Sequence, residues 1–251
     1  MTFFISHLHT DLRRTRLTKR GSTHDASQVP KGKHKVYPRM DRIILPAPQK
    51  LEMSLDLALL SRSSTMLQGG DAPLSVKDYG DLLGHALKKR DGSNSRNYPS
   101  GGALYPIETY VIATTFDGAT PGVYHYDPTA HALERLWDLP ASFEMTKLVA
   151  KPDFLMPSAV IIFTSVWKRS SAKYGDFTYG LSLLEAGHMS ENIVLVSAAL
   201  GLESRPMAGF NDQETMRLLD LDAEHEQPVH SVTLSKGARV SSTSNSVETA
   251  L

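Results

Sequence analysis

The sequence contains no cysteine. This absence excludes disulfide bonds, thiolate nucleophiles and cysteine metal ligands, and it agrees with a reducing compartment. No hydrophobic run approaches the roughly 20 residues that a membrane-spanning helix needs. The start of the chain, MTFFISHLHTDLRRTR, lacks a basic segment followed by a long apolar segment, so it does not resemble a signal peptide. We therefore expect a cytoplasmic protein that does not associate with membranes.

The chain also lacks net charge and any metal-binding pattern. Its 27 Lys and Arg residues balance 27 Asp and Glu residues, which argues against nucleic-acid binding. Ten histidines are scattered along the chain, and none belongs to an HExxH motif, so we predict no metal site. With 251 residues, 41% of them hydrophobic, the composition is that of a globular protein with a substantial core.

Charge is unevenly distributed along the chain. Residues 1–50 contain eleven Lys or Arg and three Asp or Glu, whereas the remainder contains sixteen and twenty-four. The densest basic stretch is KGKHK, residues 31–35. We favour a solvated, partly disordered extension, and an arm that holds nucleic acid, an acidic partner or an acidic peptide stays open. The predicted organisation is a basic extension over residues 1–35, a domain over 36–240 and a flexible tail over 241–251.

Hydrophobic periodicity predicts helices alternating irregularly with strands. Ser54, Ser75, Ser142, and Asn211 or Asp212 are the expected helix N-caps, and Gly201 is the expected helix end. The predicted helices cover residues 55–62, 75–89, 142–150, 176–202 and 212–221; the predicted strands cover 40–46, 108–115, 122–128, 131–136, 158–167 and 227–235. Because the strands are mainly linked as hairpins, we predict the α+β class.

The stretch NYPSGGALYPIETYVIA, residues 97–113, places two adjacent glycines directly before a predicted strand. Glycine lacks a Cβ atom and accepts positive φ angles. The stretch therefore has two interpretations: a tight turn without chemistry, or a loop whose backbone approaches a ligand.

Several motifs occur in an order that resembles one family. They are PSGGALYPIE (99–108), GVYHYDP (122–128), KYG (173–175), LLEAGH (183–188), and AGF (208–210) followed by LLDLD. Over residues 36–237 the chain resembles the flavin-dependent azoline dehydrogenases, the oxidases of microcin-type and streptolysin-type synthetases within the nitroreductase-like superfamily.

This resemblance implies an α+β, nitroreductase-like fold with a central, mainly antiparallel sheet flanked by helices. It implies a homodimer with flavin mononucleotide (FMN) at the interface. The implied reaction oxidises a peptide thiazoline or oxazoline to a thiazole or oxazole: a base removes a ring proton, a hydride goes to the flavin, and oxygen reoxidises the flavin. The implied partners are a precursor peptide and the cyclodehydratase subunits of a bacteriocin synthetase.

The resemblance also assigns flavin-binding residues. A guanidinium flanked by hydroxyls suits a phosphate, which assigns Arg62, Ser63 and Ser64 to that group; Thr65 stands where the family often has a second Arg. Tyr105 has two equally weighted interpretations, core residue or flavin wall. The remaining assignments are backbone approach at Ser100, Gly101, Gly102, Ala208 and Gly209, a hydrogen bond from Asn192, and phosphate binding by Lys236 or Arg239.

The family's Lys-Tyr pair corresponds to Lys173 and Tyr174, which we assign to catalysis and place in a loop. Tyrosine is a poor base at neutral pH because its pKa of about 10 keeps the hydroxyl protonated. An adjacent ammonium lowers that pKa and favours the phenolate, which can accept a proton. Gly180 stands where the family usually has an Arg. Glu185 and His188 lie one helical turn apart, and we favour a buried, hydrogen-bonded pair over a direct role at the flavin.

Three functions stay open at this point. The first is the peptide azoline dehydrogenase. The second is an NAD(P)H-dependent nitroreductase or flavin reductase that acts on small molecules. The third is a non-catalytic scaffold subunit of a synthetase complex.

Overall fold

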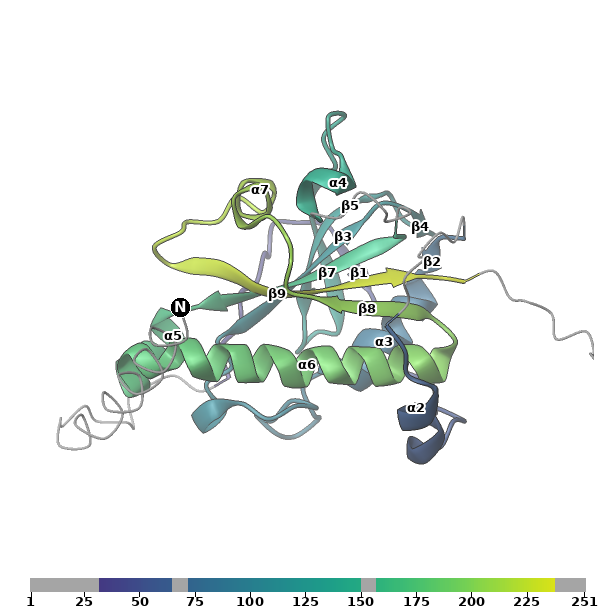
Figure 1. The fold of residues 1–251 in the computed structure, drawn as a ribbon, viewed down its shortest axis with the longest axis horizontal. Coiled ribbons are helices and arrows are strands. Elements are labelled where there is room, and N and C mark those ends of the chain that lie inside the picture. Colours follow the sequence, from purple (N-terminus) through teal and green to yellow (C-terminus); the bar gives the residue numbers. More distant parts are fainter. Residues whose placement is uncertain (1–31, 65–71, 150–156, 238–251) are drawn as a thin grey trace, which may run out of the picture.

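A computed structural model describes residues 32–64, 72–149 and 157–237 of the chain. Its centre is a seven-stranded sheet of order β1-β6-β5-β3-β7-β9-β8, in which every neighbouring pair is antiparallel (Figure 1). The strands are β1 (Arg42–Ile44), β3 (Ile107–Ala113), β5 (Gly122–Asp127), β6 (Ala132–Asp138), β7 (Ala159–Val166), β8 (Glu203–Met207) and β9 (Glu226–Ser235). Two short strands, β2 (Leu74–Ser75) and β4 (Phe116–Asp117), form a separate parallel pair.

Helices cover both faces of the sheet (Figure 1). The long α6 (Thr178–Leu200) lies along one face together with α3 (Val76–Leu87) and α2 (Leu55–Ser61). On the other face lie α4 (Met145–Leu148) and α7 (Asp212–Leu218). The short α5 (Lys168–Tyr174) and the 3-10 turn η4 (Gly175–Phe177) connect β7 to α6, and another 3-10 turn, η3 (Gly101–Ala103), precedes β3. The predicted α+β fold with a mainly antiparallel sheet is confirmed.

Alternation along the central strands builds two cores. In β3, Ile107 and Val111 face α3 and α6, whereas Tyr110 and Ile112 face α4 and α7. A strand alternates its side chains between the two sides of a sheet, so a strand buried on both sides is apolar at nearly every position. This explains why ETYVIA is almost continuously apolar.

Local sequence signals set several helix ends as expected. The Ser75 side chain accepts a hydrogen bond from the backbone of Asp78, and Asp78 reciprocates, which forms a capping box at the start of α3. Asn211 caps α7 through the backbone of Glu214. Gly201 ends α6 in the left-handed conformation, with a φ of 68°.

Four expectations were wrong in detail. The segment that holds Lys173 and Tyr174 is a helix, α5, and not a loop. Residues 203–207, where no strand was predicted, form β8, which lies at the edge of the sheet beside β9. The helix expected over 142–150 is the single turn α4, which begins after Glu144. Ser54 precedes α2, but its side chain makes no capping hydrogen bond.

The described end of the basic arm lies on the sheet. His34 Nε2 is 2.9 Å from Asp127, and Lys35 pairs with Glu226 while its backbone N–H donates to Glu108. The backbone N–H of Tyr37 donates to Glu134 over 3.0 Å. Residues 34 and 35, at the end of the predicted extension, are therefore attached to the domain, and Lys31 lies outside the described residues.

None of the helices in the described ranges is both long and apolar enough to span a lipid bilayer.

Candidate functional site

The glycine turn, residues Ser100 to Tyr105, has an unusual backbone. Gly102, Ala103 and Tyr105 have positive φ angles of 65°, 55° and 50°. Only glycine adopts this conformation at little cost, so two non-glycine residues with positive φ indicate local strain. Strain of this kind gathers at ligand sites, where the surrounding structure holds it in place. The observation favours the ligand-loop interpretation of this stretch over a plain turn.

The glycine turn packs against α5 and the first half of α6. A Cβ atom on Gly102 would lie 2.7 Å from Tyr174 Oη and 2.9 Å from Lys173 Nζ. A Cβ atom on Gly101 would lie 3.2 Å from a methyl group of Leu181. The structure thus brings together two groups that the sequence separates by 71 residues, the glycines and the Lys-Tyr pair.

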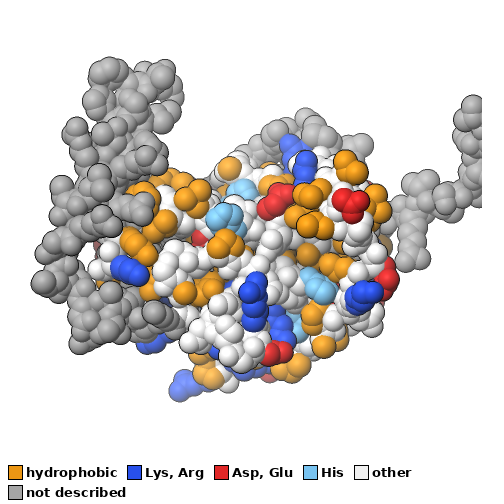
Figure 2. All heavy atoms as spheres, turned by 90° about the horizontal axis from the view of Figure 1, so that it is seen from below, with side chains coloured by type: hydrophobic (Ala, Val, Ile, Leu, Met, Phe, Trp, Pro, Cys, Tyr) orange, Lys and Arg blue, Asp and Glu red, His pale blue; other side chains and the backbone are white. Residues whose placement is uncertain are grey.

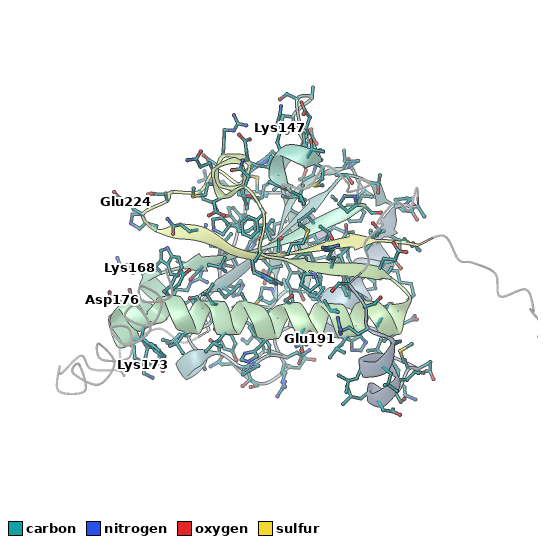
Figure 3. All side chains as sticks on the ribbon, in the orientation of Figure 1. Lys147, Lys168, Lys173, Asp176, Glu191 and Glu224 are labelled. Atoms are coloured by element: carbon teal, nitrogen blue, oxygen red, sulfur yellow. The ribbon has the colours of Figure 1, made fainter. Side chains whose placement is uncertain are left out.

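The Lys-Tyr pair occupies the last two positions of α5. Lys173 is exposed and Tyr174 is half-buried, and Lys173 Nζ lies 5.2 Å from the centre of the Tyr174 ring. Figure 3 shows Lys173 below the start of α6, while Lys168, at the other end of α5, points to the opposite side. The phenol oxygen and the ammonium therefore face the glycine turn from one side.

Glu185 lies beneath the glycine turn. It is 2% exposed; its Oε2 accepts a hydrogen bond from Ser100 Oγ, whose oxygen in turn accepts one from the backbone N–H of Tyr105. Its Oε1 is buried. Burial raises the pKa of Glu185 to about 7, although Ser100 and Arg96 act in the opposite direction.

The preferred interpretation of LLEAGH as a buried pair was wrong. His188 is exposed, and Glu185 bonds to Ser100 instead. The side chains of residues three apart on a helix point about 60° away from each other. At the edge of the buried face of α6, this difference leaves Glu185 in the core and His188 in solvent. Glu185 is therefore a buried carboxyl attached to the glycine turn, and it titrates near neutral pH.

Glu185→Gln should flatten the dependence of stability on pH. The folded-state pKa lies above the ordinary value of 4.5, so the folded protein holds the proton more tightly, and wild-type stability falls as pH rises from about 4.5 through 7. Gln accepts the Ser100 hydrogen bond but does not titrate. As pH rises from 4.5 to 8, the free energy of unfolding of the variant should increase by roughly 3 kcal/mol relative to that of the wild type.

Urea unfolding at pH 4.5 and pH 8 measures this difference. Glu191→Gln, at an exposed position on the same helix, is the matched control and should follow the wild type. An unchanged pH dependence in Glu185→Gln would refute the assignment.

Tyr105 belongs to the core. It is 3% exposed, and its Oη accepts a hydrogen bond from the backbone N–H of Arg96. Arg96 is 5% exposed; its guanidinium lies 4.6 Å from the Tyr105 ring centre and donates to Tyr98 Oη. Of the two interpretations of Tyr105, the structure favours the core residue that supports the glycine turn.

The predicted phosphate residues lie at the end of α2. Arg62 is half-buried, Ser63 and Ser64 are exposed, and the Arg62 guanidinium has no ion pair within residues 32–64, 72–149 and 157–237. The C-terminal end of a helix repels an anion weakly, so a phosphate here would depend on the charge of Arg62. Thr65 and Arg239 lie outside the described residues.

Lys236 is not a free cation. Its Nζ lies 2.8 Å from Asp78, a residue of the capping box of α3. Burial by itself would raise the pKa of Asp78, but hydrogen bonds from Lys236 and Ser75 lower it below its usual range. A phosphate would therefore share Lys236 with a carboxylate.

Asn192 and the Ala208-Gly209 pair differ in accessibility. The Asn192 amide donates to the backbone oxygens of Ala86 and Asn97 over 3.1 and 3.0 Å, which fixes α6 to the chain that enters the glycine turn. Ala208 and Gly209 directly follow β8 and are exposed, and a Cβ atom on Gly209 would meet no atom within 4 Å. Backbone approach by a ligand is thus open at Gly209.

The predicted residues gather at two ends of α6. Arg62 directly follows α2, which lines a cavity together with Leu195 and Ala199 of the second half of α6. Lys236 lies beside the C-terminal end of α6. The glycine turn contacts Leu181 and Glu185, about 20 Å away along α6. The exposed backbone at Gly102 and Gly209 and the guanidinium of Arg62, which has no ion pair among the described residues, fit a flavin nucleotide. However, a single chain does not bring the end of α2 with Arg62, Ser63 and Ser64 (the Arg62 corner) beside the glycine turn.

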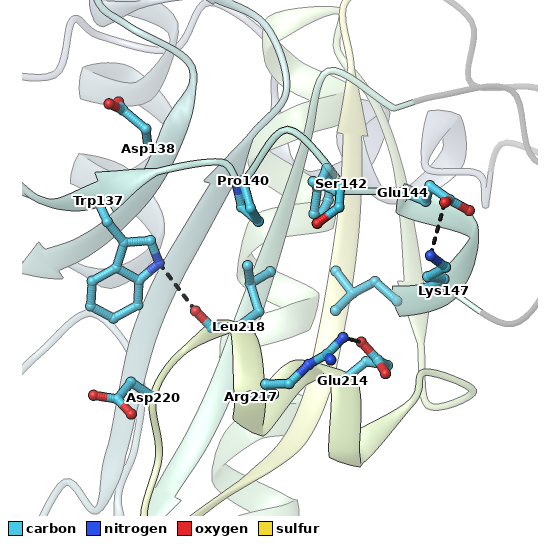
Figure 4. A pocket seen from close by; sticks show the side chains of 12 residues that line it. Trp137, Asp138, Pro140, Ser142, Glu144, Lys147, Glu214, Arg217, Leu218 and Asp220 are labelled. Atoms are coloured by element: carbon cyan, nitrogen blue, oxygen red, sulfur yellow. Dashed lines mark hydrogen bonds and ion pairs between the residues drawn. The ribbon is translucent and has the colours of Figure 1, made fainter.

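A cavity of about 610 Å³ lies on the other face of the sheet, between α4 and α7 (Figure 4). Trp137 donates a hydrogen bond to the Leu218 backbone oxygen at its floor, and the pairs Glu144-Lys147 and Glu214-Arg217 lie on its rim. It contains none of the predicted site residues. No cluster of three or more metal-ligating side chains occurs in the part of the chain that the structure describes.

Arg169 is a site residue that sequence reasoning missed. It lies in α5, pairs with Glu108 and donates to the Tyr105 backbone oxygen over 3.2 Å. Arg169 and Lys173 are four residues apart, so they share a helix face. That spacing would have revealed Arg169 if the segment had been predicted as a helix.

Comparison with known proteins agrees with this fold. Residues 70–236 match the family model described as the nitroreductase family. The chain belongs to the nitroreductase family.

Curated relatives divide between two kinds of protein. A Methanocaldococcus jannaschii protein named as a nitroreductase is 28% identical over 182 residues, which is 72% of this chain and 91% of that protein. The microcin B17-processing protein McbC of Escherichia coli is 32% identical over 168 residues, which is 62% of this chain and 60% of McbC.

A solved structure also resembles the chain over nearly its whole length. A chain of the E. coli microcin synthetase McbBCD complex, bound to truncated pro-MccB17, superposes with a TM-score of 0.61 at 24% identity, over 94% of this chain and 92% of that one. The resemblance predicted from the motifs, to nitroreductase-like proteins that include a microcin-processing protein, is confirmed.

Proposed function

We propose that this nitroreductase-family protein is an FMN-dependent dehydrogenase that oxidises azoline rings in a precursor peptide. The observation that supports this most is the contact between Gly102 and the Lys173-Tyr174 pair, because a phenol and an ammonium beside a strained, glycine-rich turn suit the removal of a ring proton. A reductase that only passes hydride between NAD(P)H and a small molecule needs no base at this position.

The residues divide the reaction between them. Bound FMN supplies the hydride acceptor. Tyr174 takes the proton from the ring carbon, and Lys173 supplies a positive charge beside its ring. The exposed backbone of Gly102 and of Ala208-Gly209 lets the flavin and the peptide approach closely, and Arg62, Ser63, Ser64 and Lys236 hold the phosphate. The ring thus loses one proton and one hydride and becomes aromatic.

The active unit is a homodimer. The two groups of predicted residues are about 20 Å apart along α6, so a second copy of the chain must bring its glycine turn to the Arg62 corner of the first. Exposed large apolar side chains on the same face support this pairing (Figure 2); they are Leu55, Leu57, Leu59 and Leu60 of α2 and Tyr179, Leu183 and Leu184 of α6. Such a face is usually covered by another chain.

The substrate is a ribosomal precursor peptide that partner subunits have already cyclised. This part of the proposal rests on the similarity to McbC and on the resemblance to a chain of the McbBCD complex. The protein would act beside cyclodehydratase subunits in such a complex.

Mass spectrometry of a cyclised peptide tests the proposal. The purified, FMN-loaded protein should remove two hydrogens per azoline ring under air, with and without its synthetase partners present. The uncyclised peptide is the control and should keep its mass. An unchanged mass together with rapid bleaching of the flavin by NAD(P)H would replace the proposal with a small-molecule reductase. A colourless protein that does not take up FMN would leave a scaffold role.

A further inference from the structure

Arg169 connects α5 to the entrance of β3. Its Nη2 forms an ion pair with Glu108 Oε1, and its Nη1 donates to the Tyr105 backbone oxygen over 3.2 Å. Glu108 is the second residue of β3, and Tyr105 closes the glycine turn. One guanidinium therefore bonds at once to the central sheet and to the turn, which a planar group with several donors can do and an ammonium cannot do as well.

Glu108 is a rigid anchor. It is 1% exposed; its Oε2 lies 2.9 Å from His125 Nε2, and its Oε1 also accepts a hydrogen bond from the Lys35 backbone N–H over 2.6 Å. Burial would raise the pKa of Glu108, but His125 and Arg169 hold it at about 2. The carboxylate therefore stays charged and in place over the whole physiological pH range.

The other end of α5 meets the same turn. Tyr174 and Lys173 are the closest groups to the position of a Gly102 Cβ atom, and they follow Arg169 by about one turn of helix, 6 to 8 Å. Helix α5 thus contacts the glycine turn at both ends: through Arg169 at the Tyr105 end, and through the Lys-Tyr pair at the Gly102 end.

We propose that Arg169 is a positioning residue that sets the distance between the Lys173-Tyr174 pair and the glycine turn. The catalytic role of the pair in this inference rests on the proposed function, whereas the position of the pair rests on the contacts of Arg169. A helix of seven residues has little stability of its own, so without this contact the pair would move relative to the turn. Misplacement of a catalytic group by about 1 Å can cost about a hundredfold in rate.

The test compares Arg169→Ala and Arg169→Lys with Lys168→Ala. Lys168 is the matched control, because it is the neighbouring cation on the same helix, is exposed, and has no ion pair among the described residues. Hydrogen exchange of the flavin-free protein reports on residues 100–105 and 168–174. Steady-state kinetics of the FMN-loaded protein on a cyclised peptide gives kcat and KM separately.

In Arg169→Ala, exchange in both segments should rise about tenfold, and kcat should fall about thirtyfold while KM changes less than about threefold. Millimolar guanidinium should restore part of kcat. Arg169→Lys keeps the charge but loses the double contact, so its exchange rates and its kcat should lie between those of the wild type and those of Arg169→Ala. Lys168→Ala should match the wild type in every measurement.

Unchanged exchange in Arg169→Ala would overturn the proposal. If that variant does not fold, as judged by circular dichroism, Arg169→Lys decides: wild-type exchange and wild-type kcat would show that charge alone suffices and would overturn the positioning role. If the wild type oxidises no azoline, the proposed function fails while the exchange comparison still decides the placement of α5.

Discussion

Tyr174→Phe is expected to keep FMN and to lose about a thousandfold in kcat on azoline peptides, within the range by which a positioned acid-base group accelerates a reaction. The substitution removes only the hydroxyl. The ring stays in place beside Lys173, whose Nζ is 5.2 Å from its centre, and against the Gly102 backbone. Flavin absorbance measures cofactor content, and mass spectrometry over time measures ring oxidation.

Tyr179→Phe is the matched control for this experiment. Tyr179 lies on the first turn of α6 and is exposed, and its ring centre lies 6.1 Å from that of Trp167. Losing that hydroxyl should leave turnover within about twofold, the range of ordinary surface changes. A Tyr174→Phe protein that turns over like the wild type would remove Tyr174 as the base, and the search would move to Glu185, the buried carboxyl at the same turn.

The sequence predicted the elements whose signals are local. The capping box at Ser75, the glycine at the end of α6 and the apolar run of β7 each depend on neighbouring residues, and each was found. The mainly antiparallel character of the central sheet followed from hairpin spacing and from the family resemblance, although one of its seven strands, β8, was not predicted. These features need only propensity and periodicity.

The elements that sequence reasoning missed depend on distant partners. Helix α5 has one buried residue, Ser170, so KRSSAKY carries no apolar periodicity; its ion pair with Glu108 spans 61 residues. Strand β8 contains Pro206, which normally argues against a strand. Proline is tolerated there because β8 is the edge of the sheet, where one side of the strand needs no hydrogen-bond partner.

The candidate site was predicted as a set of residues but not as an arrangement. The motifs identified the glycine turn and the Lys-Tyr pair, and the fold brings them into contact. No local pattern shows that Lys236 pairs with Asp78 or that Asn192 binds backbone oxygens, since both contacts link segments more than 90 residues apart. Roles at the flavin for these two residues stay predictions.

Gly102→Ala is expected to lower both FMN occupancy and kcat, the latter about a hundredfold. Two effects combine. The φ of 65° is costly for any residue with a Cβ atom, and the new methyl group would lie 2.7 Å from Tyr174 Oη and 2.9 Å from Lys173 Nζ. The turn or the catalytic pair must therefore move, and a displacement of about 1 Å is enough for this loss.

Gly92→Ala isolates the first of these effects, and Gly209→Ala tests the approach of the flavin at a second glycine. A methyl group on Gly209 meets no atom of the chain within 4 Å. Weaker FMN binding in that variant would therefore result from a clash between the methyl group and the flavin. Gly92 shares the positive φ, 66°, with open space around it, so it reports the cost of backbone strain alone. Gly92→Ala should lower stability by about 1 kcal/mol without affecting turnover. If Gly102→Ala behaves like Gly92→Ala, the contact between the turn and the Lys-Tyr pair has no part in catalysis, and the glycine serves only the bend of the chain.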